Sequence, residues 1–137
     1  MPTVTGILET ALYVEDLPRA RQFYQTLFDF DLLFSDDRAC GMNVAGKQVL
    51  LLFKKGASVK PIQTSGGIIP SHDGAGQTHI AFSISAAEFD DWEKWLTQNG
   101  VTIESTVNWP EGGQSLYFRD PDQHVIELAT PGTWAIY

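Results

Sequence analysis

The sequence predicts an α+β fold in which two tandem βαβββ modules form one cup-shaped mixed sheet with the helices on the outside. The main observation is that a strand pattern, an amphipathic helix pattern and three further strand patterns occur twice in the same order. The chain has 137 residues, of which 43% are hydrophobic, which suits one compact domain with a real core. We expect a single domain over residues 1–137, made of module one at 5–55, a connecting loop at 56–76, module two at 77–130 and a tail at 131–137.

The first module begins with a strand pattern over Thr5–Val14. Asp16 then predicts a helix N-cap, and Pro18 fits the first helical turn. Apolar residues follow at the three-and-four spacing of a helix that buries one face, at Leu17, Ala20, Phe23, Tyr24 and Leu27. Three short strand patterns complete the module, at Phe30–Ser35, Ala39–Ala45 and Lys47–Lys54.

The second module follows a Gly-, Ser- and Pro-rich segment, Gly56–Gly76, which predicts a long loop. A strand pattern at Thr78–Ile84 leads to Ser85 and Glu88, whose spacing is that of a capping box. Asn99–Gly100 predicts a left-handed helix stop. The helix stripe is Phe89, Trp92, Trp95 and Leu96, and the last strand patterns are Val101–Val107, Gln114–Phe118 and His124–Thr130.

The two copies can be placed in register. Glu9–Leu12 lies 70 positions before His79–Phe82, and Val49–Leu52 lies 76 positions before Val125–Leu128. One module has a sheet face covered by its helix and a bare face, so two modules that share their bare faces form a cup whose interior is a natural site. The sequence leaves open whether one chain or two chains complete the cup.

Charge and cysteine content narrow the function classes. Nine Lys and Arg against 17 Asp and Glu give a net charge of −8, which disfavours nucleic acid and anionic membranes as partners. Cys40 is the single cysteine, so neither an intrachain disulfide nor a Cys-rich metal site can form. The apolar runs are much shorter than a membrane span and no secretory leader is visible, so we expect a cytoplasmic protein.

Strand parity directs three polar side chains into the predicted cup: Glu9, His79 and Glu127. An unpaired charge there is costly, and a divalent cation would satisfy two carboxylates and one imidazole together. The repeat-related fourth position is Leu51, which cannot bind a metal ion. The alternative is structural: Glu9 pairs with a Lys or Arg at the rim, His79 is a hydrogen-bonded core residue and Glu127 is partly solvated.

Motifs along the chain resemble the vicinal oxygen chelate superfamily, which includes glyoxalase I, fosfomycin-resistance proteins, extradiol ring-cleavage dioxygenases, methylmalonyl-CoA epimerases and metal-free bleomycin-resistance proteins. The first half carries Tyr13–Leu17 followed by Phe23–Tyr24, similar to the family's strand, Asp-Leu turn and Phe-Tyr helix. The second half carries Gln77–Phe82 and Phe118–Leu128, which resemble the family's His strand and its Asp-Pro-Asp, Glu-Leu ending. The resemblance covers roughly Thr5–Thr130. The superfamily that it points to carries out many different reactions on one fold.

The resemblance implies a ligand set and two catalytic candidates. His79 and Glu127 fall on family ligand positions, whereas Glu9 stands where His or Gln is more usual, and Leu51 argues against a four-ligand glyoxalase I. Tyr117 stands where fosfomycin-resistance proteins and ring-cleavage dioxygenases have a tyrosine, and Tyr13 is a second lining candidate. His72 is either a base on a mobile lid or a solvated loop histidine.

Two functions from different classes follow. The first is a metal-dependent enzyme acting on a small oxygenated substrate, whose two neighbouring oxygens bind a divalent ion; lyase, isomerase, transferase and dioxygenase reactions all stay open, as does the general base. Oxygen chemistry would require Fe(II) or Mn(II), whereas Lewis-acid chemistry could use Ni(II), Zn(II) or Mn(II). The alternative is a metal-free binder, like bleomycin-resistance proteins, whose acidic cup holds a cationic compound stacked on Trp109. The resemblance also implies a homodimer.

Overall fold

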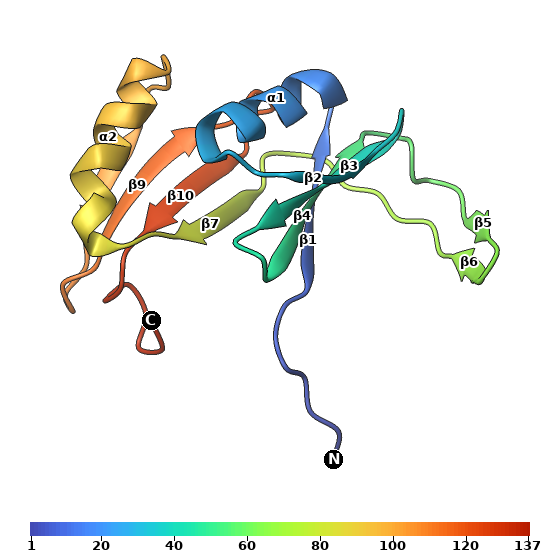
Figure 1. The fold of residues 1–137 in the computed structure, drawn as a ribbon, viewed down its shortest axis with the longest axis horizontal. Coiled ribbons are helices and arrows are strands. Elements are labelled where there is room, and N and C mark those ends of the chain that lie inside the picture. The colour runs from blue at the N-terminus through green and yellow to red at the C-terminus, as the bar shows by residue number, and fades with distance from the viewer. The chain divides into compact units, whose positions relative to one another are not determined.

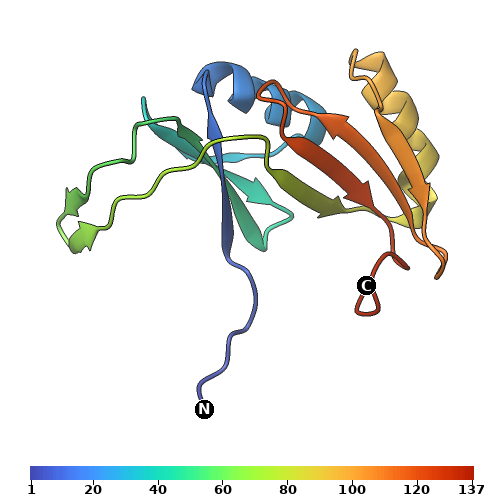
Figure 2. The same cartoon turned by 180° about the vertical axis from the view of Figure 1, so that it is seen from behind.

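A computed structural model describes residues 1–137, and the chain divides into two compact units at residues 1–75 and 76–137. Each unit contains one four-stranded sheet and one α-helix that covers a face of that sheet (Figure 1, and from behind in Figure 2). The predicted α+β fold with tandem βαβββ modules is therefore confirmed. The closure of the two sheets into one cup, and their union in one domain, stay predictions.

The sheet of the first unit has the strand order β1-β4-β3-β2. Strand β1 runs parallel to β4, and the other neighbouring pairs are antiparallel. The bounds of the elements are β1 Glu9–Val14, α1 Leu17–Phe28, β2 Leu32–Ser35, β3 Ala39–Val44 and β4 Gln48–Lys54.

Helix α1 begins as its sequence predicts. The Asp16 carboxylate accepts a hydrogen bond from the Arg19 backbone N–H at 3.0 Å, and a proline occupies the first turn. The chain leaves the helix at Asp29, which has a left-handed backbone with φ of 55°. Buried residues of α1 pack against the buried face of β1 and β4 and form the core of this unit. They are Leu17, Ala20, Tyr24 and Leu27 from α1, Leu12 and Val14 from β1, and Leu50 and Leu52 from β4.

Two expectations for the first unit are wrong. The first strand begins at Glu9 rather than Thr5, because residue pairing with β4 begins at Glu9 and Val49, and Leu8 adds only a carbonyl that accepts from the Val49 N–H at 2.9 Å. The segment 56–76 is not a plain loop, because β5 (Ile62–Thr64) and β6 (Gly67–Ile69) form a hairpin that stands away from the four-stranded sheet (Figures 1 and 2). The Thr64 hydroxyl closes its turn by donating to the Gly67 carbonyl at 2.7 Å.

The second unit repeats the order of the first. Its sheet has the order β7-β10-β9-β8, with β7 parallel to β10 and antiparallel pairing elsewhere. The predicted duplication is thus confirmed at the level of topology. The bounds are β7 His79–Ser83, a 3₁₀ turn at Ala86–Glu88, α2 Phe89–Gln98, β8 Ser105–Asn108, β9 Gln114–Arg119 and β10 Val125–Ala129.

The start of helix α2 differs from the predicted capping box. The Ser85 side chain makes no capping hydrogen bond, because the 3₁₀ turn intervenes and moves the start of the α-helix to Phe89. Phe89 and Leu96 are buried, but Trp95 is 42% exposed, so the buried stripe is narrower than predicted. Gly100 has φ of +71°, which confirms the left-handed stop.

The remaining boundaries follow the hydrogen-bonded ladder. The strand predicted at Val101–Val107 is observed as β8 from Ser105, where pairing with β9 begins. The tail folds back on its own unit, because the Tyr137 hydroxyl donates to the carbonyls of Ile84 and Ala129 at 3.1 and 3.2 Å. No helix of the structure combines the length and apolar character that a membrane crossing requires.

Candidate functional site

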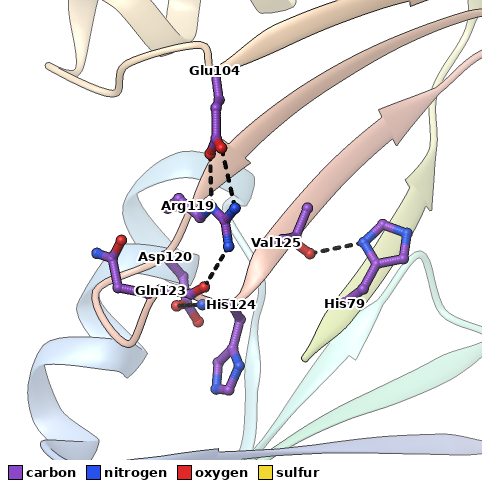
Figure 3. Close-up of polar contacts among 7 residues, drawn as sticks. All are labelled: His79, Glu104, Arg119, Asp120, Gln123, His124 and Val125. Atoms are coloured by element: carbon purple, nitrogen blue, oxygen red, sulfur yellow. Dashed lines mark hydrogen bonds and ion pairs between the residues drawn. The ribbon is translucent and has the colours of Figure 1, made fainter. Parts of the chain in front are cut away.

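His79 is the first residue of β7, and its side chain is held by the neighbouring strand. The ring nitrogen Nδ1 lies 3.0 Å from the Val125 carbonyl oxygen (Figure 3). Because a carbonyl only accepts hydrogen bonds, Nδ1 carries the hydrogen in this contact and Nε2 is the nitrogen left for other chemistry. The side chain is 51% exposed, so Nε2 is accessible to a small ligand.

Glu127 provides the second part of the site from the middle of β10. One carboxylate oxygen, Oε1, accepts hydrogen bonds from the Ser115 hydroxyl at 2.6 Å and from the Tyr117 hydroxyl at 2.8 Å. The other oxygen, Oε2, lies 3.2 Å from His79 Nε2. Glu127 is only 6% exposed, so the partly solvated carboxylate of the structural alternative is not what the structure has.

Tyr117 lies directly opposite Glu127 in the antiparallel ladder of β9 and β10. Burial raises the pKa of the Tyr117 hydroxyl above its ordinary value of 10.0, and the hydrogen bond to Glu127 and the charge of that carboxylate raise it further, against a smaller lowering by Ser115. The phenol is therefore protonated at neutral pH and acts as a hydrogen-bond donor.

The turn between β9 and β10 sets this register. The Asp120 carboxylate accepts hydrogen bonds from the backbone N–H groups of Asp122 and His124, each at 2.9 Å. Arg119 donates to the Gln123 carbonyl at 3.0 Å and forms a two-pronged ion pair with Glu104 at 2.7 and 3.1 Å (Figure 3). This closed turn fixes which residue of β9 faces each residue of β10.

His124 lies on the other face of β10, as its parity predicts. It is 1% exposed, and its Nδ1 accepts a hydrogen bond from the Thr78 backbone N–H at 3.0 Å. The Thr78 hydroxyl lies 2.9 Å from the same nitrogen. His124 thus connects the start of β10 to the residue that precedes His79, which supports the position of the candidate ligand.

The third predicted ligand, Glu9, belongs to the first unit. It is the exposed first residue of β1 and lies on the sheet face that α1 does not cover, together with Ala11 and Tyr13. The structure therefore brings His79 and Glu127 together in the second unit, whereas the convergence of Glu9 with them stays a prediction. No three His, Cys, Asp or Glu side chains gather as a ready metal site within the structure.

Tyr13 is bound to His72 within the first unit. The Tyr13 hydroxyl lies 2.6 Å from His72 Nδ1, and the His72 ring contacts Phe53 edge-on with a centroid distance of 4.6 Å. A Cβ on Gly74 would overlap the Tyr13 ring, so the loop packs closely on it. His72 is therefore a packed, hydrogen-bonded residue and not the solvated loop histidine of one reading. Burial, and then the charge of Asp73, raise the pKa of the Tyr13 hydroxyl above 10.0.

Sequence reasoning missed two residues of the site, Ser115 and the role of Trp109. Ser115 is fully buried and shares the strand face of Tyr117, two residues away, so the parity argument could have found it. Trp109 donates its indole N–H to the Ser115 hydroxyl at 2.8 Å. Its position depends on the turn before β9, and no spacing rule predicts such a contact.

Comparison with known proteins decides the family. The family model described as Glyoxalase/Bleomycin resistance protein/Dioxygenase superfamily matches residues 6–128. The chain belongs to this superfamily. The resemblance to the vicinal oxygen chelate proteins is thereby confirmed, and His79, Tyr117 and Glu127 all lie within the matched range.

The relatives of this superfamily member include proteins named metallothiol transferase FosB from several bacteria. The protein from Staphylococcus epidermidis is 31% identical over 128 residues, covering 93% of this chain and 82% of the relative. The protein from Bacillus licheniformis is 32% identical over 128 residues, covering 93% of this chain and 76% of the relative.

Solved structures agree on the fold of this superfamily member. A crystal structure of lactoylglutathione lyase from Agrobacterium tumefaciens has a TM-score of 0.88 and 30% identity, covering 98% of this chain and 99% of that one. The fosfomycin resistance protein FosX from Listeria monocytogenes has a TM-score of 0.70 over 96% of this chain and 97% of that one. At 23% identity FosX supports the shared fold alone.

Proposed function

We propose that this superfamily member is a metal-dependent enzyme whose divalent ion is held by Glu9, His79 and Glu127 and binds two neighbouring oxygens of a small substrate. The observation that carries the proposal is the way His79 Nε2 and Glu127 Oε2 face each other at 3.2 Å while Nδ1 and Oε1 are already hydrogen-bonded. A neutral imidazole in this state directs a lone pair at a carboxylate oxygen. Such a contact is unfavourable unless a cation or a proton lies between the two atoms.

The donor set suits a divalent ion. Two donor atoms that each lie about 2.1 Å from one ion are about 3.0 Å apart when the donor–ion–donor angle is a right angle, and about 3.4 Å apart when that angle is tetrahedral. The observed 3.2 Å falls in that interval. The Val125 carbonyl on Nδ1, and the two hydroxyls on Oε1, are the supporting contacts that metal-binding His and Glu residues usually have. With Glu9, two negative charges offset the charge of the ion and leave positions for the substrate.

The protein's own groups have separable roles in this proposal. A bound divalent ion would polarise a substrate oxygen and stabilise the negative charge that develops on it. Tyr117, whose hydroxyl already donates to Glu127 Oε1, would offer a hydrogen-bond donor on the same sheet face as Glu127. Tyr13 would act from the first unit, with its hydroxyl oriented by His72.

Among the reactions left open, the names of the relatives favour transfer of a thiol. Metallothiol transferases and a lactoylglutathione lyase both carry thiol chemistry in their names. In the reaction we favour, the thiol sulfur forms a new C–S bond to a ring carbon of a small cyclic electrophile, and the C–O bond of that carbon within the ring breaks. The ring oxygen stays attached to the product and takes the proton of the thiol. Because nothing leaves, the product has the summed mass of both reactants, which mass spectrometry detects directly.

Metal content tests the proposal. Protein purified without chelator is incubated with Mn(II), Fe(II), Ni(II) or Zn(II), desalted and analysed by elemental mass spectrometry. We expect about one ion per chain, as one three-ligand site requires, and a sharp loss in His79→Ala and Glu127→Ala. Asp91→Ala is the matched control, because this exposed carboxylate of α2 pairs only with Lys94 on the helix surface of the same unit. Wild-type protein that stays metal-free with all four ions would favour the alternative, a metal-free binder of cationic compounds.

We also propose that the protein forms a homodimer, in line with the family resemblance. Light scattering coupled to size exclusion measures the mass, and a monomer at micromolar concentration would contradict this. Mixing Glu9→Ala with His79→Ala protein tests how a site is completed. If each site combines Glu9 of one chain with His79 of another, a mixed dimer has one intact site and recovers metal; if one chain supplies all ligands, no site is intact.

A further inference from the structure

We propose that Trp109 is a positioning residue for the metal-binding carboxylate: its indole N–H orients the Ser115 hydroxyl, which holds Glu127 Oε1 and leaves Oε2 for the ion. The inference rests on the proposed function and assigns residues that the predicted ligand set does not contain. The hydrogen bond of the Trp109 indole goes to Ser115, so Trp109 would act through that hydroxyl.

The direction of this hydrogen-bonded chain is fixed by chemistry. An indole nitrogen can only donate, so the 2.8 Å contact requires the Ser115 oxygen to accept. The single hydrogen of the Ser115 hydroxyl is then directed to Glu127 Oε1 at 2.6 Å. Without the indole N–H, that hydroxyl would lose the partner that fixes its rotation.

Burial makes the chain of contacts effective. Ser115 is fully buried and Glu127 is 6% exposed, so water competes little for the bond between them. Hydrogen bonds to a charged group in such surroundings are stronger than exposed ones and polarise one another. The Glu127 carboxylate therefore keeps one rotamer, in which Oε1 faces the two hydroxyls and Oε2 faces His79.

The turn that carries Trp109 is itself anchored. The Trp109 backbone N–H donates to the Gly113 carbonyl at 2.7 Å, and Gly112, with φ of +90°, closes the turn by donating to the Trp109 carbonyl at 3.0 Å. A Cβ on Gly113 would overlap backbone atoms of Gly132 and Thr133, so only glycine permits this close approach. The segment after β10 thus presses on the turn before β9, and Trp109 is fixed relative to the strand that carries Glu127.

The test compares Trp109→Phe, Ser115→Ala and the double variant with wild-type protein. Phenylalanine keeps an aromatic ring but has no N–H to donate. The affinity of each apoprotein is measured by equilibrium dialysis against the ion, among Mn(II), Fe(II), Ni(II) and Zn(II), that wild-type protein retains best. Trp134→Phe is the control, because this tail residue is 73% exposed. Circular dichroism of the apoproteins confirms that each variant is folded.

Loss of a supporting contact should weaken metal binding about 10- to 100-fold in Ser115→Ala. In Trp109→Phe, loss of the indole hydrogen bond to Ser115 should weaken metal binding about 3- to 10-fold. The double variant should match Ser115→Ala if Trp109 acts through the Ser115 hydroxyl, because that hydroxyl is then already missing.

Wild-type affinity in Trp109→Phe, or a double variant whose loss is the product of the two single losses, overturns the inference while leaving the metal site intact. Wild-type protein that binds none of the four ions overturns the proposed function, and this inference with it. If Ser115→Ala does not fold, Trp109→Phe carries the test by itself.

Discussion

The contact between Tyr13 and His72 should make a measurable contribution to the stability of the first unit. Tyr13→Phe removes one partly buried hydrogen bond of 2.6 Å, so we expect the free energy of unfolding to fall by about 1 kcal/mol. His72→Ala also removes the ring contacts with Tyr13 and Phe53, and should cost about 2 kcal/mol. Urea unfolding of both variants and of the double variant gives a coupling energy of about 1 kcal/mol if the two side chains interact as described.

The pH dependence of this contact has a definite sign. The folded protein raises the pKa of Tyr13 above 10.0, so the folded state holds the phenolic proton more tightly than the unfolded chain does. The stability that this provides is complete below pH 10 and declines as the pH rises through the folded pKa. The difference in the free energy of unfolding between wild type and Tyr13→Phe should therefore shrink above pH 10. A coupling energy near zero, or an advantage that persists unchanged in strong alkali, would refute the reasoning.

Three further predictions concern other parts of the chain. Glu127→Gln keeps the shape of the side chain, so the apoprotein should unfold within about 1 kcal/mol of wild type in urea, while metal affinity in dialysis falls by at least about 100-fold; retained affinity would exclude the carboxylate as a ligand. Gly113→Ala should destabilise the protein by about 2 to 3 kcal/mol because the added Cβ meets backbone, and an unchanged melting temperature would contradict this. Asp36→Ala should cost about 1 kcal/mol at neutral pH. The backbone N–H groups of Arg38 and Ala39 lower the pKa of the Asp36 carboxyl below 3.8, so its contribution is present above that pH and is lost as the pH falls through the folded pKa, where urea curves of wild type and variant should converge.

The fold was readable from the sequence because its signals are local and occur twice. Asp16, Pro18 and the spaced apolar residues define α1, and Gly100 ends α2 through a backbone that glycine adopts easily. The errors lie where pairing between strands, rather than local sequence, decides where an element begins. Ile7 and Leu8 look like strand residues but are 68% and 70% exposed, and residue pairing with β4 begins only at Glu9. The short hairpin β5–β6 was hidden in a segment whose composition is that of a loop.

The candidate site was only partly readable, for a different physical reason. Parity along regular strands places His79, Tyr117 and Glu127 on one face, and the pairing of β9 with β10 brings the last two opposite each other. Trp109 reaches Ser115 from an irregular turn held by a contact between glycines, so its place depends on the folded backbone. The bond of Tyr13 to His72 likewise depends on a loop that crosses from 59 positions away.

The most direct test of the central claim is the metal content of Glu9→Gln beside that of Glu15→Gln. Glu9 comes from the first unit and the other two proposed ligands from the second, so this residue tests whether all three bind one ion. Glu15 is a matched exposed carboxylate in the same unit that pairs with Lys55. We predict that Glu15→Gln retains the ion as wild type does, whereas Glu9→Gln loses most of it. Equal metal content in both variants would contradict the shared site.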